Sequence, residues 1–271
     1  PGYGEVAALR HQTETSRPQS GRDERDPYTV PMPLRKSSNV DMTSLRVAVF
    51  VDDGVATPTP ETKKAVADSA NALRKVGTQI VEACPPMMDQ VHDLWAYNII
   101  PLWLSAAMYY PQQYAALTHS PVAEKRHFST EFLVTLLEGS LRERNYSFDR
   151  QTELLAALQR YRAEMMRFMA DFDAILSPVL QSPAGPHPDP SETLESSVEE
   201  FWKTAKAESG GYCVAHNLTG WPAVVVRGGT SPEGLPIGVH VAAIPWREDV
   251  ALAVAGALEQ RLGGWQPPPN L

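Results

Sequence analysis

The most regularly patterned part of the sequence is Asn217-Leu-Thr-Gly-Trp-Pro-Ala-Val-Val-Val-Arg-Gly-Gly, followed after one residue by Ser231-Pro-Glu-Gly-Leu-Pro-Ile-Gly-Val-His-Val-Ala-Ala. Two apolar runs in it, each long enough for a strand, flank a loop that is rich in glycine and proline. Glycine and proline at these positions allow the chain to reverse direction. We therefore expect two antiparallel strands with a long connection between them.

A helix is expected directly after these strands, from about residue 247 to residue 262. Glu248 and Asp249 lie at its N-terminal end and Arg261 lies near its C-terminal end, so each charge complements the helix dipole. Gly263 and the glycine after it end the helix.

Further upstream, the chain has the pattern of a strand, a helix and a second strand. Val47–Val51 is a short apolar run typical of a buried strand. Thr59 followed by Pro60 predicts the start of a helix, and Gly77 predicts its end. Thr78–Ala83 is the second predicted strand. Such a crossover unit places its two strands parallel.

Apolar and aromatic residues recur at helical spacing through residues 88–170, and Phe172–Val179 then has the pattern of another strand. The proline-rich segment Gln181–Pro190 follows as a loop. The expected fold is therefore a three-layer α/β structure with a mixed sheet of about five strands flanked by helices. In this arrangement the helices of residues 88–170 form an insertion between the second and third strands.

The chain divides into two parts by composition. Residues 1–44 are polar with almost no apolar periodicity, so we expect a mostly irregular arm or linker. Residues 45–271 are expected to form the α/β domain.

The charge balance limits the classes of partner. The chain has 24 basic and 32 acidic residues, a net charge of -8, which disfavours binding to a nucleic-acid backbone. Its longest apolar stretches, Ile99–Tyr110 and Val250–Leu258, are shorter than the roughly 20 residues of a membrane-spanning helix. Two cysteines cannot form a disulfide framework, which favours a reducing, cytoplasmic location. A small-molecule ligand fits this composition best.

No metal or cofactor site is evident from the pattern. The seven histidines lack paired metal-ligand spacing, and no H-E-x-x-H motif occurs. His216 and His240 lack an activated serine or cysteine in a glycine-rich setting, so structural roles are the expectation for both. We expect no cofactor and no metal.

The patterned stretches together resemble a known family. Asn217–Ala223, then Gly234-Leu-Pro-Ile-Gly-Val, then Arg247-Glu-Asp with an alanine-rich helix, resemble the C-terminal region of the amidase signature family. Arg46–Pro86 resembles the strand, helix and strand element that follows the central linker of that family. Asp173–Ala184 resembles the inner strand of the family and the proline-rich loop after it. The resemblance implies a partial amidase signature fold and an activity class, hydrolysis of a carboxylic amide C–N bond.

The resemblance also implies where catalysis resides. Members of the family use a serine nucleophile, a second serine and a lysine base, all in the half that precedes the part seen here. No Gly-Gly-Ser-Ser-Gly-Gly-like run occurs in this sequence, and Lys36-Ser37-Ser38 lacks flanking glycines. We therefore expect no catalytic residue in this chain and no activity from it alone.

Four residues are substrate-pocket candidates by this resemblance: Gln181 after the third strand, and Asn217, Thr219 and Gly220 ahead of the fourth. The competing explanation for Asn217 and Gly220 is that they end a helix. An amide substrate is expected only if an N-terminal half completes the fold. Without that half, a sheet edge and an apolar face would be uncovered, and the chain is expected to associate with itself through them. The alternatives are a noncatalytic α/β interaction module and an independent small-molecule binder.

Overall fold

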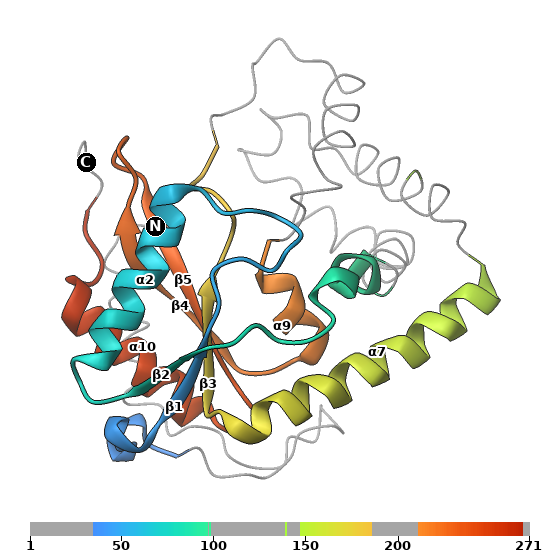
Figure 1. Ribbon diagram of the computed structural model, residues 1–271, viewed down its shortest axis with the longest axis horizontal. Coiled ribbons are helices and arrows are strands. Elements are labelled where there is room, and N and C mark those ends of the chain that lie inside the picture. The colour runs from blue at the N-terminus through green and yellow to red at the C-terminus, as the bar shows by residue number, and fades with distance from the viewer. Residues whose placement is uncertain (1–34, 97, 99–138, 140–146, 186–210, 268–271) are drawn as a thin grey trace, which may run out of the picture.

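The computed structural model describes residues 35–96, 98, 139, 147–185 and 211–267, and its strands form one five-stranded mixed sheet (Figure 1). Across the sheet the strand order is β2-β1-β3-β5-β4. The strands are β1 (Arg46–Val49), β2 (Gln79–Glu82), β3 (Ala174–Pro178), β4 (Ala223–Thr230) and β5 (Pro236–Ala243). The α-helices are α2 (Pro60–Arg74), α7 (Phe148–Phe168), α9 (Cys213–Thr219) and α10 (Glu248–Leu262). Short 3-10 helices are η1 (Ser37–Asn39), η2 (Met42–Ser44), η3 (Met88–Gln90) and η4 (Met169–Asp171).

The pairing of the strands confirms the mixed sheet and the two predicted pairs, β1 with β2 and β4 with β5, and it shows the partners of β3, which the sequence did not predict. β1 is parallel to both β2 and β3, whereas β5 is antiparallel to both β3 and β4. The predicted strand Phe172–Val179 is shorter in the structure, since pairing with β1 and β5 begins at Ala174. The crossover from β1 through α2 to β2 and the final hairpin of β4 and β5 are both as expected.

Helices α2 and α10 cover one face of the sheet (Figure 1). Thr59 occupies the predicted N-cap of α2, but its hydroxyl pairs with the Thr62 hydroxyl at 3.0 Å instead of capping a backbone N–H. Val66 and Leu73 lie on the inner stripe of α2 and are fully buried, which contributes roughly 1.5–3 kcal/mol for each side chain. The core on this face also contains Val47, Val49, Leu176, Val239, Val241, Val250, Val254 and Leu258.

Helices α7 and α9 cover the other face, which completes the three layers (Figure 1). Two hydrogen bonds join these helices: the Tyr161 hydroxyl donates to the Ala215 carbonyl at 3.0 Å, and Arg162 Nε donates to the Leu218 carbonyl at 2.8 Å. Because α9 has only seven residues, it depends on such tertiary contacts for its stability. The core on this face contains Ala48, Phe50, Leu94, Leu158, Met165, Ile175, Val214 and Trp221.

Residues on both sides of the expected boundary at residue 44 contact each other. Val40 and Met42 pack against the core on the α2 face, and the Thr78 hydroxyl donates to the Met42 carbonyl at 2.9 Å. Residues 1–34 of the predicted arm lie outside the described residues, as does most of the predicted helical insertion. Among the described residues, no helix is long and apolar enough to cross a membrane.

Two glycine-to-alanine substitutions test this packing in opposite directions. A Cβ at Gly228 in β4 would lie 2.5 Å from Val239 Cγ1, so we expect Gly228→Ala to destabilise the fold by about 1–3 kcal/mol. A Cβ at Gly256 in α10 would meet nothing within 4 Å, so Gly256→Ala should stabilise it by about 0.5–1 kcal/mol. Urea unfolding measures both. Equal free energies of unfolding for the two variants would contradict the packing of β4 against β5.

Candidate functional site

The carboxyl ends of β1 and β3 form the point where the parallel part of the sheet changes winding direction. From β1 the chain crosses to β2 on one side, and it returns to β3 on the other. Ligands of α/β proteins bind most often outside such a point. Two hydrogen bonds join the segment that follows β1 to β3 and to the segment that follows β3. Phe50 N donates to the Leu176 carbonyl at 3.2 Å, and Thr59 N donates to the Gln181 carbonyl at 2.8 Å.

Gln181 follows the carboxyl end of β3 by three residues and is only 9% exposed. Its side-chain oxygen Oε1 is buried and accepts no hydrogen bond. An unpaired buried acceptor costs about 1–3 kcal/mol, and such groups are rare in folded proteins. Gln181 is therefore the predicted site residue whose geometry is best suited to contact a ligand.

Two ionisable groups near this end of the sheet are held in their neutral forms. Burial, with the nearby carboxylates of Asp53 and Asp52, raises the pKa of the Cys84 thiol to about 11. The Tyr212 hydroxyl donates to the Ala56 carbonyl at 2.6 Å, and burial raises the pKa of Tyr212 well above its usual range. A thiol with a raised pKa is a poor nucleophile, so this part of the site can bind a ligand but lacks an activated attacking group.

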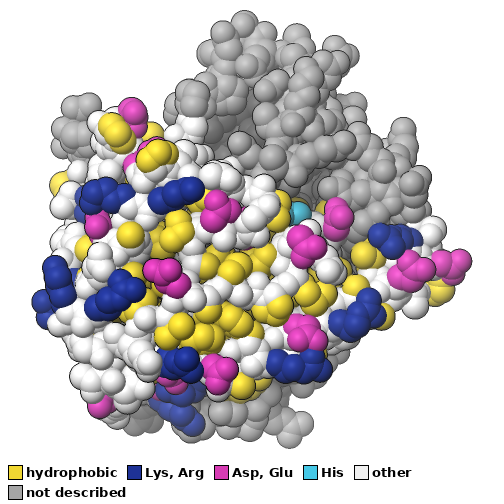
Figure 2. Space-filling model, in the orientation of Figure 1, with side chains coloured by type: hydrophobic (Ala, Val, Ile, Leu, Met, Phe, Trp, Pro, Cys, Tyr) yellow, Lys and Arg dark blue, Asp and Glu magenta, His cyan; other side chains and the backbone are white. Residues whose placement is uncertain are grey.

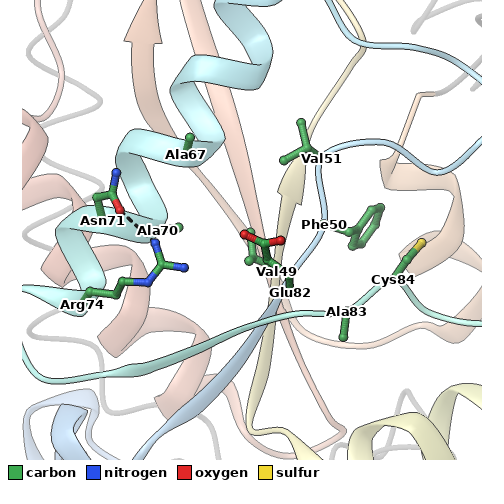
Figure 3. Close-up of a pocket in the computed structure, with 10 residues that line it drawn as sticks. All are labelled: Val49, Phe50, Val51, Ala67, Ala70, Asn71, Arg74, Glu82, Ala83 and Cys84. Atoms are coloured by element: carbon green, nitrogen blue, oxygen red, sulfur yellow. Dashed lines mark hydrogen bonds between the residues drawn. The ribbon is translucent and has the colours of Figure 1, made fainter.

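A pocket of about 410 Å³ opens between α2 and the ends of β1 and β2 (Figure 3). Val49, Phe50 and Ala70 contribute to its apolar lining. Figure 3 shows Arg74 and Glu82 on opposite sides of the pocket, and Arg74 Nη1 donates to Asn71 Oδ1 at 2.8 Å. This open groove offers one cation and one anion to a ligand. It contains no paired nucleophile and base among the described residues.

The predicted residues Thr219 and Gly220 take part in ending α9. Gly220 adopts a left-handed conformation with φ of 68°, and its N–H donates to the His216 carbonyl. The Thr219 hydroxyl donates to the same carbonyl at 2.9 Å. Asn217 is exposed on α9. The alternative explanation by helix capping thus accounts for the hydrogen bonds of Thr219 and Gly220.

The four predicted pocket residues do not come together in one place. Gln181 follows the carboxyl end of β3, whereas Asn217, Thr219 and Gly220 lead into β4, whose first residue pairs with Ala242 at the opposite end of the sheet. Gly220 lines a second cavity there, of about 470 Å³, with Trp221 and Trp246 among its walls. Gly220 therefore lies at the other end of the sheet from Gln181, whereas α9, which carries Asn217 and Thr219, starts beside the end of β3, where Tyr212 N donates to the Val179 carbonyl at 3.0 Å.

Lys36-Ser37-Ser38 forms no site in the structure. Ser37 and Ser38 belong to η1, and Lys36 and Ser38 are exposed. The buried Ser177 hydroxyl donates to the Pro178 carbonyl at 3.1 Å, and His240 is its partner residue in β5. No catalytic residue can be assigned among the described residues.

The pairing of His216 and His240 was not foreseen from the sequence. The two rings stack with centroids 4.5 Å apart, His216 on α9 and His240 on β5. One signal was present, because His240 interrupts an apolar strand between two valines, but nothing in the sequence places α9 over it. No group of three or more metal-ligating side chains occurs in the part of the chain that the structure describes.

Figure 2 shows one face of the molecule in the orientation of Figure 1. Acidic and basic side chains are interspersed on it, with hydrophobic side chains between them. No continuous basic area is seen on the described part of this face.

Comparison with known proteins gives a consistent assignment. The family profile described as Amidase matches residues 10–252. Fatty acid amide hydrolase 1 of Caenorhabditis elegans is 25% identical over 276 residues, covering 90% of this chain and 47% of that protein. Indoleacetamide hydrolase of Bradyrhizobium japonicum is 26% identical over 250 residues, covering 90% and 48%.

A solved structure has the same fold. The 6-aminohexanoate cyclic dimer hydrolase complexed with substrate matches with a TM-score of 0.64 at 22% identity, covering 92% of this chain and 52% of that one. The chain thus spans about half the length of the proteins that it matches. Since the family profile covers most of its residues, this chain belongs to the amidase family.

Proposed function

We propose that this chain supplies the sheet and one wall of the substrate cleft in a hydrolase that cleaves a carboxylic amide C–N bond. In this proposal the serine nucleophile, the second serine and the lysine base come from the remainder of the amidase fold. The substrate is a small-molecule amide, bound only when that remainder is present on the same or on another polypeptide. The free thiols of Cys84 and Cys213 suit a reducing compartment such as the cytoplasm.

The observation that carries this proposal is the match to about half of each relative, combined with the chemistry of the described residues. A lysine base must be desolvated to lose its proton near neutral pH. The described lysines are on the surface: Lys36 and Lys75 are exposed, Lys63 lies 3.8 Å from Asp52, and Lys64 pairs with Asp68. None of them can act as that base.

Gln181 is our preferred cleft residue. Its buried, unpaired Oε1 is an acceptor that could receive a hydrogen bond from a substrate amide N–H, a group that every primary or secondary amide carries. Asn217 stays a candidate because it is exposed, whereas the hydrogen-bonding groups of Thr219 and Gly220 are used by the end of α9.

A noncatalytic interaction module is the second candidate function. The observation in its favour is β4, an outer strand of the described sheet, where Val225 is 53% exposed although its partner His240 is buried. Exposed apolar edge strands pair readily with other chains.

The isolated chain should hydrolyse neither aliphatic nor aryl amides, because no activated nucleophile is present among its described residues. Release of ammonia or aniline measures this, with an intact amidase as the positive control. Ser37→Ala should behave as the wild type does. Hydrolysis by the wild-type chain that Ser37→Ala abolishes would overturn the proposal.

Replacing Gln181 tests whether its unpaired oxygen is retained for a ligand. Gln181→Met keeps the size of the side chain and removes the buried acceptor, so the free energy of unfolding should rise by about 1 kcal/mol. Urea denaturation of the two proteins gives this difference. A loss of stability instead would mean that the Gln181 amide stabilises the fold, and it would remove Gln181 as a cleft residue.

We also propose that the chain, when alone, self-associates through β4. Val225→Lys places a charge on this edge strand and should lower the association constant at least tenfold, as measured by analytical ultracentrifugation over a range of concentrations. Leu155→Lys on α7 is the matched control, since Leu155 is similarly exposed at 46%. A wild-type chain that stays monomeric at the highest concentration would refute this role of β4.

A further inference from the structure

The stacked pair of His216 and His240, hereafter the histidine pair, lies in the layer between α9 and the sheet. His216 is 3% exposed and His240 is 4% exposed. The rings are 4.5 Å apart between centroids with an interplanar angle of 24°. α9 is a helix of seven residues, and this contact joins it to β5.

Both imidazoles lack the hydrogen bonds that buried rings normally make. Neither ring nitrogen of His216 has a partner, and Nδ1 of His240 has none. The in-plane lone pairs of stacked rings do not converge on one point, so the arrangement is unsuited to chelating a metal ion. The pair is best described as a stacking contact between two neutral rings.

Few ionisable groups among the described residues surround the pair. α7 brings Tyr161 and Arg162, whose polar atoms donate to carbonyls of α9, and α9 itself brings Cys213, whose thiol contacts the Val179 carbonyl. β4 brings Arg227. β3 and β5 bring no ionisable side chain besides His240 itself. None of these groups is a carboxylate that could compensate a charge on either ring.

The energetic consequence is that protonation of either ring opposes the packing of α9 on the sheet, which is the closed state; in the open state α9 is detached and the rings are exposed. Burial, followed by the charge of His240, lowers the pKa of His216 from 6.5 to about 3. Burial lowers the pKa of His240 from 6.5 to about 4. A group whose pKa is depressed in the closed state binds protons better when exposed, so falling pH favours exposure.

We propose that the histidine pair is an acid-sensitive switch that holds α9 on the sheet while both rings are neutral and releases α9 when they take up protons. α9 is fully held above about pH 6.5, the ordinary pKa of histidine, and becomes progressively easier to open as the pH falls toward about 4. Because α9 carries Asn217 and leads into β4, opening would also rearrange the proposed cleft wall. That last consequence rests on the proposed function, whereas the switch does not.

Hydrogen exchange of the full chain between pH 7 and pH 5, corrected for intrinsic rates and read by mass spectrometry, tests the switch. One imidazole that titrates near 6.5 when open and near 4 when closed lowers the protection of α9 by about 20-fold over this range. Peptides covering residues 211–221 should therefore lose protection by about 20-fold or more, while those of α10 change little. Unchanged protection of residues 211–221, or an equal loss in α10, would overturn the proposal.

Variants assign the effect to the pair. His240→Gln and His216→Phe each remove one titrating ring, and each should reduce the pH dependence of α9 protection at least tenfold. His92→Gln, at a partly exposed histidine outside the pair, should leave it as in the wild type. Should either substituted chain fail to fold, imidazole proton resonances of the wild type provide a second measurement. Two histidines titrating below about pH 5 would support the switch, and none doing so would refute it.

Discussion

The packing of β3 in the centre of the sheet is the constraint on which the rest of the structure depends. All five of its residues are buried, and it pairs in parallel with β1 and antiparallel with β5. It thus joins the crossover unit of β1, α2 and β2 to the hairpin of β4 and β5. Its carboxyl end also fixes α9, because the Val179 carbonyl accepts hydrogen bonds from Tyr212 N and from the Cys213 thiol.

Polar groups without partners gather where β3 meets the α9 face. Gln181 follows β3 directly, His240 lies opposite Ser177 in the sheet, and His216 stacks on His240 from α9. Each of these groups costs stability where it lies, since a buried polar atom loses its bonds to water. The opposite face, with α2 and α10, is filled by aliphatic side chains.

Membership in the amidase family and the chemistry of the described residues are consistent with each other. The family accounts for the mixed sheet and the final hairpin. The described residues provide crevices and hydrogen-bond acceptors but no desolvated lysine and no activated serine. The chain spans about half the length of these relatives and has the fold of the family.

The sequence by itself determined the five strands and two of their pairs, β1 with β2 and β4 with β5. The apolar runs at Val47 and Val239, the N-cap at Thr59 and the turn glycines act over a few residues, and such local signals are readable without a structure. Tertiary structure alone decided which polar residues meet. It placed Gln181 and Gly220 at opposite ends of the sheet, although the resemblance had grouped them, and it stacked His216 on His240. The reason is that such contacts depend on how α9 crosses the sheet, which is set by packing over the whole domain and not by any short stretch of residues.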